Sequence, residues 1–101
     1  MNYVSLFNLI KNKALQANSS AIDEIMEILD SADLPTTRAV DLYLGTVTSK
    51  EGIERIRYYL FSGSQIQRNY CTLFFSRRND WDVVNEAYNR GCIDHIQAYS
   101  R

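Results

Sequence analysis

Two similar stretches of sequence decide the predicted fold. The first, AIDEIMEILDSADLPTTR, runs from Ala21 to Arg38, and the second, GIERIRYYLFSGSQIQR, runs from Gly52 to Arg68. In both, apolar residues lie three and four positions apart, which is the spacing of one face of a helix, and a turn follows. With Ile22 aligned on Ile53 the two stretches are offset by 31 residues. The alignment predicts a helix pair of about 30 residues that occurs more than once.

A third copy of this unit follows in the last part of the sequence. Gly63 aligns with Gly91, and Leu60 aligns with Tyr88, at an offset of 28 residues. Because turns, helix starts and arginines align together with the apolar positions, we expect helix pairs that stack as a solenoid. The alternative is an ordinary antiparallel helical bundle, since any such bundle gives some matches at helical spacing.

Start and stop signals give the expected helices. Ser20 and Asp80 are predicted N-caps, and Thr48–Glu51 and Ser64–Gln67 have the spacing of a capping box. Gly63 and Gly91 are predicted to end helices in the left-handed conformation. The predicted helices span residues 2–17, 21–31, 35–46, 50–62, 65–77, 81–90 and 93–100, with short connections, and they predict a single all-α domain over residues 1–101.

Composition places the chain among ordinary globular proteins. Its 101 residues are 46% hydrophobic, which is enough to bury a core without disulfides or metals. The net charge of −1 gives no overall attraction to nucleic acid or to an anionic membrane. The two cysteines, Cys71 and Cys92, do not form a C-x-x-C pair, and no segment has the pattern of a signal peptide or a membrane span. These features predict a soluble, cytoplasmic protein with reduced thiols.

One segment resembles a known family. The sequence DLPTTRAVDLYLG, from Asp33 to Gly45, resembles the first helix of a HEAT repeat, in particular the short HEAT-like type of phycobilisome lyases. Such helices have an Asp, a short spacer, an Arg and a stretch that ends in Ala-Leu-Gly, and Asp33, Arg38 and Leu44–Gly45 match these positions. The later copies depart from the pattern, with Ser64 at the Asp position, Phe74–Phe75 at the Leu-Gly position and Gln97 at the Arg position.

The resemblance implies an architecture for most of the chain. It implies an α-α superhelix of about three helix pairs, a short right-handed solenoid. It also implies that Arg38 and Arg68 join neighbouring units through a polar ladder. A fold of this kind is compatible with many functions, so function has to be argued from side chains.

The outward side of the second helix in each pair is the predicted binding surface. On a helical wheel that starts at Ile53, Arg55 and Tyr58 point away from the core. In the solenoid that the resemblance implies, this side is the concave one. The predicted partner-binding residues are Glu24, Glu27, Arg55, Tyr58, Val83 and Glu86. The alternative is that these residues are only solvated.

From this surface we predict a non-catalytic scaffold or adaptor that binds another protein or a peptide. Five acidic residues and no Lys or Arg lie between Ala21 and Asp33, which favours a partner with a basic segment. A homo-oligomer also fits this prediction. Exposed tyrosine and arginine side chains are favoured anchors at interfaces.

Nucleic-acid binding is the alternative function. It would use Arg55, Arg77, Arg78 and Arg90, since arginines beside an indole can hold a phosphate and stack a base. Asp80, Asp82 and Glu86 dilute this basic cluster, so we favour a structural role in which Trp81 lies in the core. Tyr70, Tyr88 and Tyr99 fall on core positions of the repeat and are also predicted to be largely buried.

Catalytic chemistry has little support in the sequence. His95 is the single histidine, and Cys92-x-x-His95 has no second ligand pair, so we expect no metal and no cofactor. The acids from Asp23 to Asp30 could place two carboxylates on one helix face, but acid–base catalysis would require one of them to be desolvated. We therefore expect no enzymatic activity.

Overall fold

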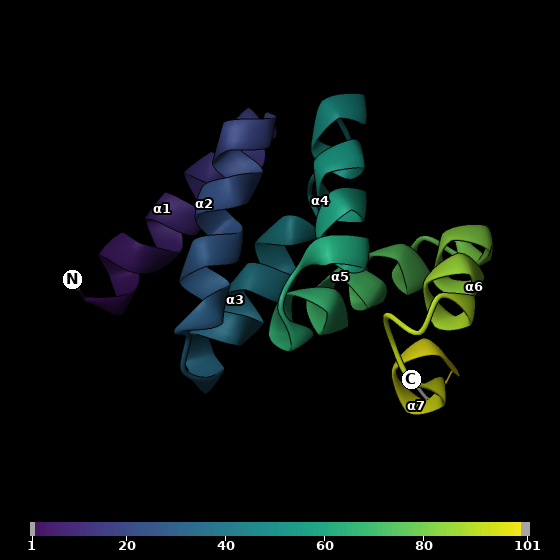
Figure 1. Cartoon of the computed structure of the whole chain (residues 1–101). Helices are drawn as coiled ribbons and strands as arrows, with labels where there is room; N and C mark the ends of the chain where they lie inside the picture. The colour runs from purple at the N-terminus through teal and green to yellow at the C-terminus, as the bar shows by residue number, and fades with distance from the viewer. Residues whose placement is uncertain (1, 100–101) are drawn as a thin grey trace. The chain divides into compact units, whose positions relative to one another are not determined.

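The computed structural model describes residues 2–99, and every regular element in this range is an α-helix (Figure 1). The elements are α1 (Tyr3–Gln16), α2 (Ser19–Asp30), α3 (Leu34–Leu44), α4 (Lys50–Ser62), α5 (Gln65–Arg77), α6 (Trp81–Asn89) and α7 (His95–Tyr99). The all-α prediction is confirmed, and α4 and α5 begin and end at the predicted residues. The predicted end of the last helix, at residue 100, lies outside the described residues. None of the helices within residues 2–99 is both long and apolar enough to span a bilayer.

The chain divides into two compact units, Met1–Arg55 and Ile56–Arg101. The division falls inside α4, so the first turns of this helix belong to the first unit and the remaining turns belong to the second. The single domain over residues 1–101 stays a prediction.

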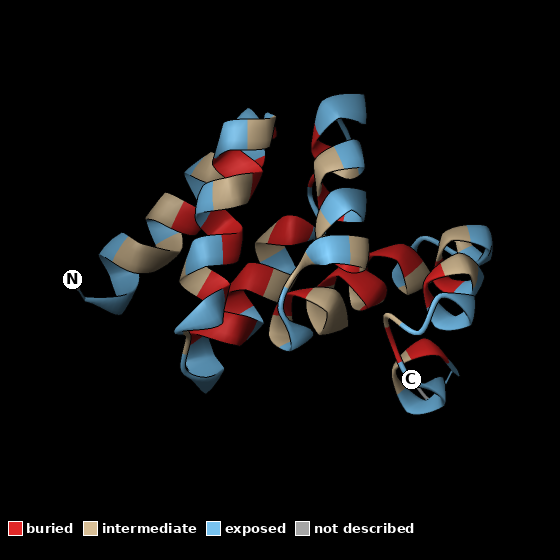
Figure 2. Ribbon diagram, viewed as in Figure 1, coloured by how far each residue is buried: buried red, intermediate tan, exposed pale blue. Residues whose placement is uncertain are grey.

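The first unit has its core among α1, α2 and α3, which pack on one another. Each of these helices has a buried side and an exposed side, as Figure 2 shows by its red and pale blue bands. The apolar spacing read from the sequence explains this, because residues three and four apart lie on one helix face. The fully buried side chains are Ile10, Ile22, Ile25, Met26, Leu29, Val40, Leu44 and Val47.

The turn between α1 and α2 differs from the prediction. Asn18 is the N-cap, because its side-chain oxygen accepts a hydrogen bond from the Ala21 N–H at 2.8 Å. The helix therefore begins at Ser19, and the predicted cap, Ser20, lies inside its first turn. Ala17, just before the cap, is left-handed with φ 53°. This conformation costs a residue with a Cβ about 1–2 kcal/mol.

The start of α4 also corrects a predicted cap. Ser49, rather than Thr48, caps the helix, because its hydroxyl oxygen accepts from the Gly52 N–H at 3.0 Å. The same hydroxyl donates to the Ala17 carbonyl at 2.8 Å. Glu51, the predicted partner of Thr48, instead accepts a hydrogen bond from the Ser19 N–H at 2.7 Å. Both contacts join the start of α4 to the α1–α2 turn.

The second unit has its core among α5, α6 and α7, which pack on one another. Its buried apolar side chains are Ile56, Leu60, Cys71, Phe74, Phe75, Val84, Ala87, Ile93 and Ala98. Burial raises the pKa of the Cys71 thiol above its ordinary value. Cys92 is only half-buried, and its sulfur lies 3.8 Å from the Phe61 carbonyl oxygen.

Helix ends in the second unit confirm two predicted signals and correct two. The Ser64–Gln67 capping box is present, and Gly91 is left-handed with φ 76°. Gly63 does not have a positive φ; a Cβ there would lie 2.6 Å from the Tyr59 carbonyl oxygen, so close packing requires the glycine. Asp80 precedes α6 but makes no side-chain cap hydrogen bond.

Candidate functional site

Half of the predicted partner-binding residues belong to the first unit. Glu24 and Glu27 are exposed on α2, as predicted. A carboxylate oxygen of Glu24 lies 2.7 Å from the Lys13 Nζ, so this charge is partly neutralised within the chain. Arg55 is half-buried, because its guanidinium binds the Asp23 carboxylate through Nε at 2.6 Å and Nη2 at 3.2 Å. Of the predicted partner-binding acids on α2, Glu27 and the exposed part of Glu24 therefore remain accessible.

The other half belongs to the second unit. Tyr58 is 49% exposed, and its ring packs edge-on against Tyr59 with centroids 5.2 Å apart. Glu86 is half-buried and accepts from Arg57 at 3.2 Å and from Arg90 at 2.8 Å. Val83 is half-buried. Tyr58 is thus the most accessible of the three predicted side chains in this unit.

The arginines of the nucleic-acid alternative are largely engaged within the chain. Arg55 binds Asp23 in the first unit, as described above. In the second unit Arg78 lies over the Phe74 ring at 4.3 Å, and Arg90 both binds Glu86 and lies over the Phe61 ring at 4.9 Å. These contacts use the charge and the planar face that phosphate binding and base stacking would need.

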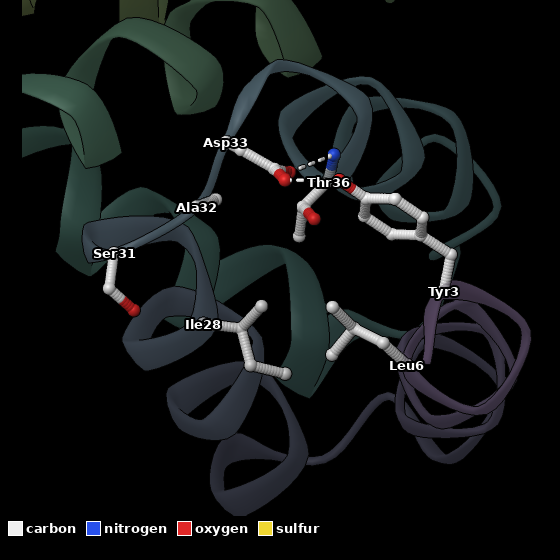
Figure 3. A pocket seen from close by; sticks show the side chains of 7 residues that line it. All are labelled: Tyr3, Leu6, Ile28, Ser31, Ala32, Asp33 and Thr36. Atoms are coloured by element: carbon white, nitrogen blue, oxygen red, sulfur yellow. Dashed lines mark hydrogen bonds between the residues drawn. The ribbon is translucent and has the colours of Figure 1, made fainter. Parts of the chain in front are cut away.

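A pocket of about 440 Å³ lies in the first unit (Figure 3). Its lining residues are Tyr3, Leu6, Ile28, Ser31, Ala32, Asp33 and Thr36. Figure 3 shows the Tyr3 ring reaching across from α1 to Asp33, where the phenol donates to the carboxylate. Asp33 also accepts from the Thr36 N–H at 3.0 Å, which caps α3.

These hydrogen bonds shift the pKa values of both residues. Hydrogen bonds from Thr36 and from Tyr3 lower the pKa of the Asp33 carboxyl, because they stabilise its ionised form. The hydrogen bond to Asp33 raises the pKa of the Tyr3 phenol, because it requires the phenol proton. The polar groups at the rim of this pocket therefore satisfy one another and the end of a helix.

A second pocket, of about 300 Å³, lies in the second unit. It is lined by Leu73, Ser76, Arg77, Trp81, Ala98 and Tyr99. Trp81 is 42% exposed and Tyr99 is 41% exposed, so the prediction that they lie in the core is wrong. Tyr88, also predicted to be buried, is exposed, whereas Tyr70 is half-buried.

The orientation of α6 explains this correction for Trp81 and Tyr88. Val84 and Ala87 are the buried residues of the helix. At about 100° per residue, Trp81 and Tyr88 then point roughly 70–90° away from the centre of the buried side. The repeat alignment had placed the core side one position away, because it matched Trp81 and Tyr88 with Ile53 and Leu60.

The exposed aromatic residues of α6 and α7 form one cluster. The rings of Tyr88, His95 and Tyr99 contact one another, with centroids 5.4 Å apart for the two tyrosines and 5.1 Å apart for His95 and Tyr99. The Tyr99 hydroxyl donates to the Asn85 side-chain oxygen. His95 thus contacts the two tyrosine rings edge-on or at a tilt. Residues 2–99 contain no group of three or more His, Cys, Asp or Glu that could hold a metal ion.

Comparisons with protein-family models, with curated proteins and with solved structures found no match for this chain. The resemblance to HEAT repeats therefore rests on the sequence alone. Asp33, one of its key residues, caps α3, while Arg38 is exposed. The Nε of Arg68 is buried and donates no hydrogen bond to any acceptor within residues 2–99.

Proposed function

We propose that the chain is a non-catalytic module that binds another protein or a peptide. The observation that supports this proposal is the exposure of Trp81 and Tyr99 at the rim of one pocket, with Arg77 beside them. Tryptophan, tyrosine and arginine are the residue types most enriched where alanine substitution weakens protein interfaces most. A cluster of large aromatic side chains left in water favours a partner that covers it.

A HEAT-like stack of helix pairs is part of the proposal. Polar contacts between helices recur at similar distances along the chain: 30 residues separate Tyr3 from Asp33, 32 separate Asp23 from Arg55, and 29 separate Arg57 from Glu86. The Cys92–Phe61 contact adds a separation of 31. A unit of about 30 residues gives this spacing when equivalent positions of successive units lie side by side. Such preformed helices reduce the entropy lost when a partner binds.

The predicted concave face is a second surface for the same function. Glu24, Glu27 and Tyr58 are exposed, which leaves them accessible to a partner. Glu24 and Glu27 would favour a basic segment, and Tyr58 would supply an aromatic contact. Binding at the pocket should be weakened by substitution of Trp81, and binding at the predicted concave face by substitution of Tyr58. One experiment can therefore distinguish the two surfaces.

The test is a selection of binders from a phage-displayed random peptide library on the immobilised chain. Binding of the selected peptides is then measured for the wild type and for Trp81→Ala, Tyr58→Ala and the control Leu42→Ala, which removes an exposed apolar side chain of α3. We expect Trp81→Ala to weaken binding by about 30-fold, the size of a dominant interface residue. Circular dichroism verifies that each variant is folded.

The other outcomes are equally informative. If Tyr58→Ala abolishes binding and Trp81→Ala does not, the predicted concave face is the binding surface. If the library gives no peptide that distinguishes these variants from Leu42→Ala, the proposed peptide-binding function is wrong.

A further inference from the structure

We propose that the pocket of the second unit binds a peptide segment that is both acidic and apolar. A bulky apolar side chain of the partner would lie between Trp81 and Tyr99, and a neighbouring carboxylate would bind Arg77. This inference rests on the proposed peptide-binding function and specifies the chemistry of the partner.

The walls of the pocket determine the apolar half of the ligand. Trp81 and Tyr99 contribute rings, and Leu73 and Ala98 contribute aliphatic surface. A volume of about 300 Å³ is at the lower end of the range for ligand pockets. Such a space suits a side chain of a bound segment, and covering the exposed rings removes apolar surface from water.

The charge of the pocket determines the acidic half of the ligand. Among residues 2–99, Arg77 is the charged residue that lines the pocket. Asp80 and Asp82, which flank Trp81 in the sequence, are not among the lining residues. A guanidinium has five N–H donors, so it can bind a carboxylate while it keeps a contact within the chain. Aromatic rings also attract cations, but a cationic ligand here would lie against Arg77 and be repelled.

The site is held in place before a partner binds. The Tyr99 ring packs edge-on against Tyr88 and at a tilt against His95, its hydroxyl is bound to Asn85, and the adjacent Ala98 is buried. The Ser76 hydroxyl donates to the Thr72 carbonyl at 2.8 Å, which leaves its oxygen free to accept a peptide N–H. Such preorganisation lowers the entropy cost of ordering side chains on binding.

The chain contains its own probe of this pocket, because Trp81 is its one tryptophan. The experiment titrates the full chain with three peptides that lack Trp and Tyr and follows Trp81 emission. The first is acetyl-Gly-Leu-Glu-Phe-Glu-Gly-amide, and the other two replace both Glu residues by Gln or by Lys. We expect saturable binding of the acidic peptide and at least tenfold weaker binding of the other two, since a charge-assisted hydrogen bond is worth more than a neutral one.

Two variants test the role of Arg77. Arg77→Gln should weaken binding of the acidic peptide about tenfold, which corresponds to the loss of one charge-assisted contact. Binding of the Gln peptide should be unchanged. Arg38→Gln, which removes an exposed arginine of the first unit, is the matched control and should change neither affinity. An equal loss in both variants would show a general charge effect and overturn the inference.

The failures of the two proposals are distinguishable. If the Gln or Lys peptide binds as tightly as the acidic peptide, or more tightly, the inferred preference for an acidic segment is overturned. The proposed peptide-binding function is not overturned by that result. If none of the three peptides binds but library-selected peptides still require Trp81, the inference is overturned and the proposed function is not. If Trp81 emission instead changes with protein concentration alone, and sedimentation shows a dimer that competes with the peptide, then the occupant is a second copy of the chain and this inference is wrong.

Discussion

Gly52 lies where α4 begins, closely surrounded by three other parts of the first unit. A Cβ at this position would lie 2.7 Å from the Val47 Cγ1 and 2.8 Å from both the Ala17 carbonyl oxygen and the Ser49 Oγ. We expect Gly52→Ala to lower the free energy of unfolding by about 1–3 kcal/mol, the usual cost of overpacking. Urea denaturation followed by circular dichroism measures this change.

Gly45→Ala is the control for this prediction. Gly45 has a right-handed φ of −59°, and the nearest atom to an added Cβ, the Leu42 carbonyl oxygen, lies 3.3 Å away. Its effect should stay within about 1 kcal/mol, because alanine also reduces the entropy of the unfolded chain. Equal destabilisation by both substitutions would contradict the close packing of Gly52.

Tyr3 and Asp33 link stability to pH at opposite ends of the scale. The pKa of Asp33 is lowered in the folded chain, so its contribution is present above about pH 4 and is lost as the pH falls through the folded pKa. The pKa of Tyr3 is raised, so its contribution is present below about pH 10 and is lost as the pH rises through the folded pKa.

Tyr3→Phe should therefore remove the alkaline loss of stability that comes from this pair and reduce the acid loss. The measurement is the free energy of unfolding in urea from pH 3 to pH 11, for the wild type, Tyr3→Phe and the control Tyr43→Phe. A pH profile of Tyr3→Phe that is parallel to that of the wild type would show that this hydrogen bond does not contribute to the pH dependence of stability.

At the scale of the element, Ser49 determines where α4 starts. Its hydroxyl caps the helix at Gly52 and also binds the Ala17 carbonyl at the end of α1. Ser49→Ala should cost about 1–2 kcal/mol, because it removes a cap and leaves a part-buried carbonyl without its donor. Thr48→Ala, at the position that the sequence pattern favoured as the cap, should have a much smaller effect. If Thr48→Ala lowers the free energy of unfolding in urea more than Ser49→Ala does, then Thr48 is the cap, as the sequence predicted.

Helix existence was predictable because it depends on local periodicity, whereas the caps depend on competition between neighbours. Asn18, Ser19 and Ser20 are all residue types that cap helices, and so are Thr48 and Ser49. At α4, Ser49 is the cap, and its hydroxyl also binds the Ala17 carbonyl, 32 residues earlier in the chain. No local pattern reveals this contact. For the same reason the repeat alignment predicted the α6 helix but placed its core side toward Trp81 and Tyr88, so Trp81 was assigned to the core.

The residues of the candidate site could be predicted only in part. The exposure of Glu24, Glu27 and Tyr58 follows from helical periodicity, and the structure agrees. The ion pairs of Arg55 and Glu86 join different helices, so their half-buried state could not be read from one helix at a time. The pocket beside Trp81 is lined by residues of three helices, whose packing the sequence does not give, although two arginines close to Trp81 in the sequence gave a weak signal.

At the scale of the whole molecule, α4 is one continuous helix that contributes to both compact units. Because helix formation is cooperative, loss of packing around either half of α4 weakens the other half. We expect the urea transition of Trp81 emission, which reports the second unit, to coincide with the transition of circular dichroism, which reports all helices. Separate transitions in the wild type would show that the units unfold independently.

A break in α4 should separate these transitions. Glu54→Pro places a proline at an exposed position inside the helix, where it costs about 3 kcal/mol and interrupts the backbone hydrogen bonds. Glu54→Ala, which favours the helix, is the matched control and should leave the two probes coincident. Coincident transitions in both variants would mean that α4 does not mediate the coupling.

The reactivity of the fully buried Cys71 should report how often the core of the second unit opens. Because its thiol is hidden and its pKa is raised, an aromatic disulfide reagent should label it only in molecules whose core has transiently opened. The half-buried Cys92 should react first, so labelling of the native chain would proceed in a fast and a slow phase of one thiol each. In Cys92→Ser only the slow phase should remain. Its rate, relative to that of the unfolded chain, then gives the fraction of time that the core spends open.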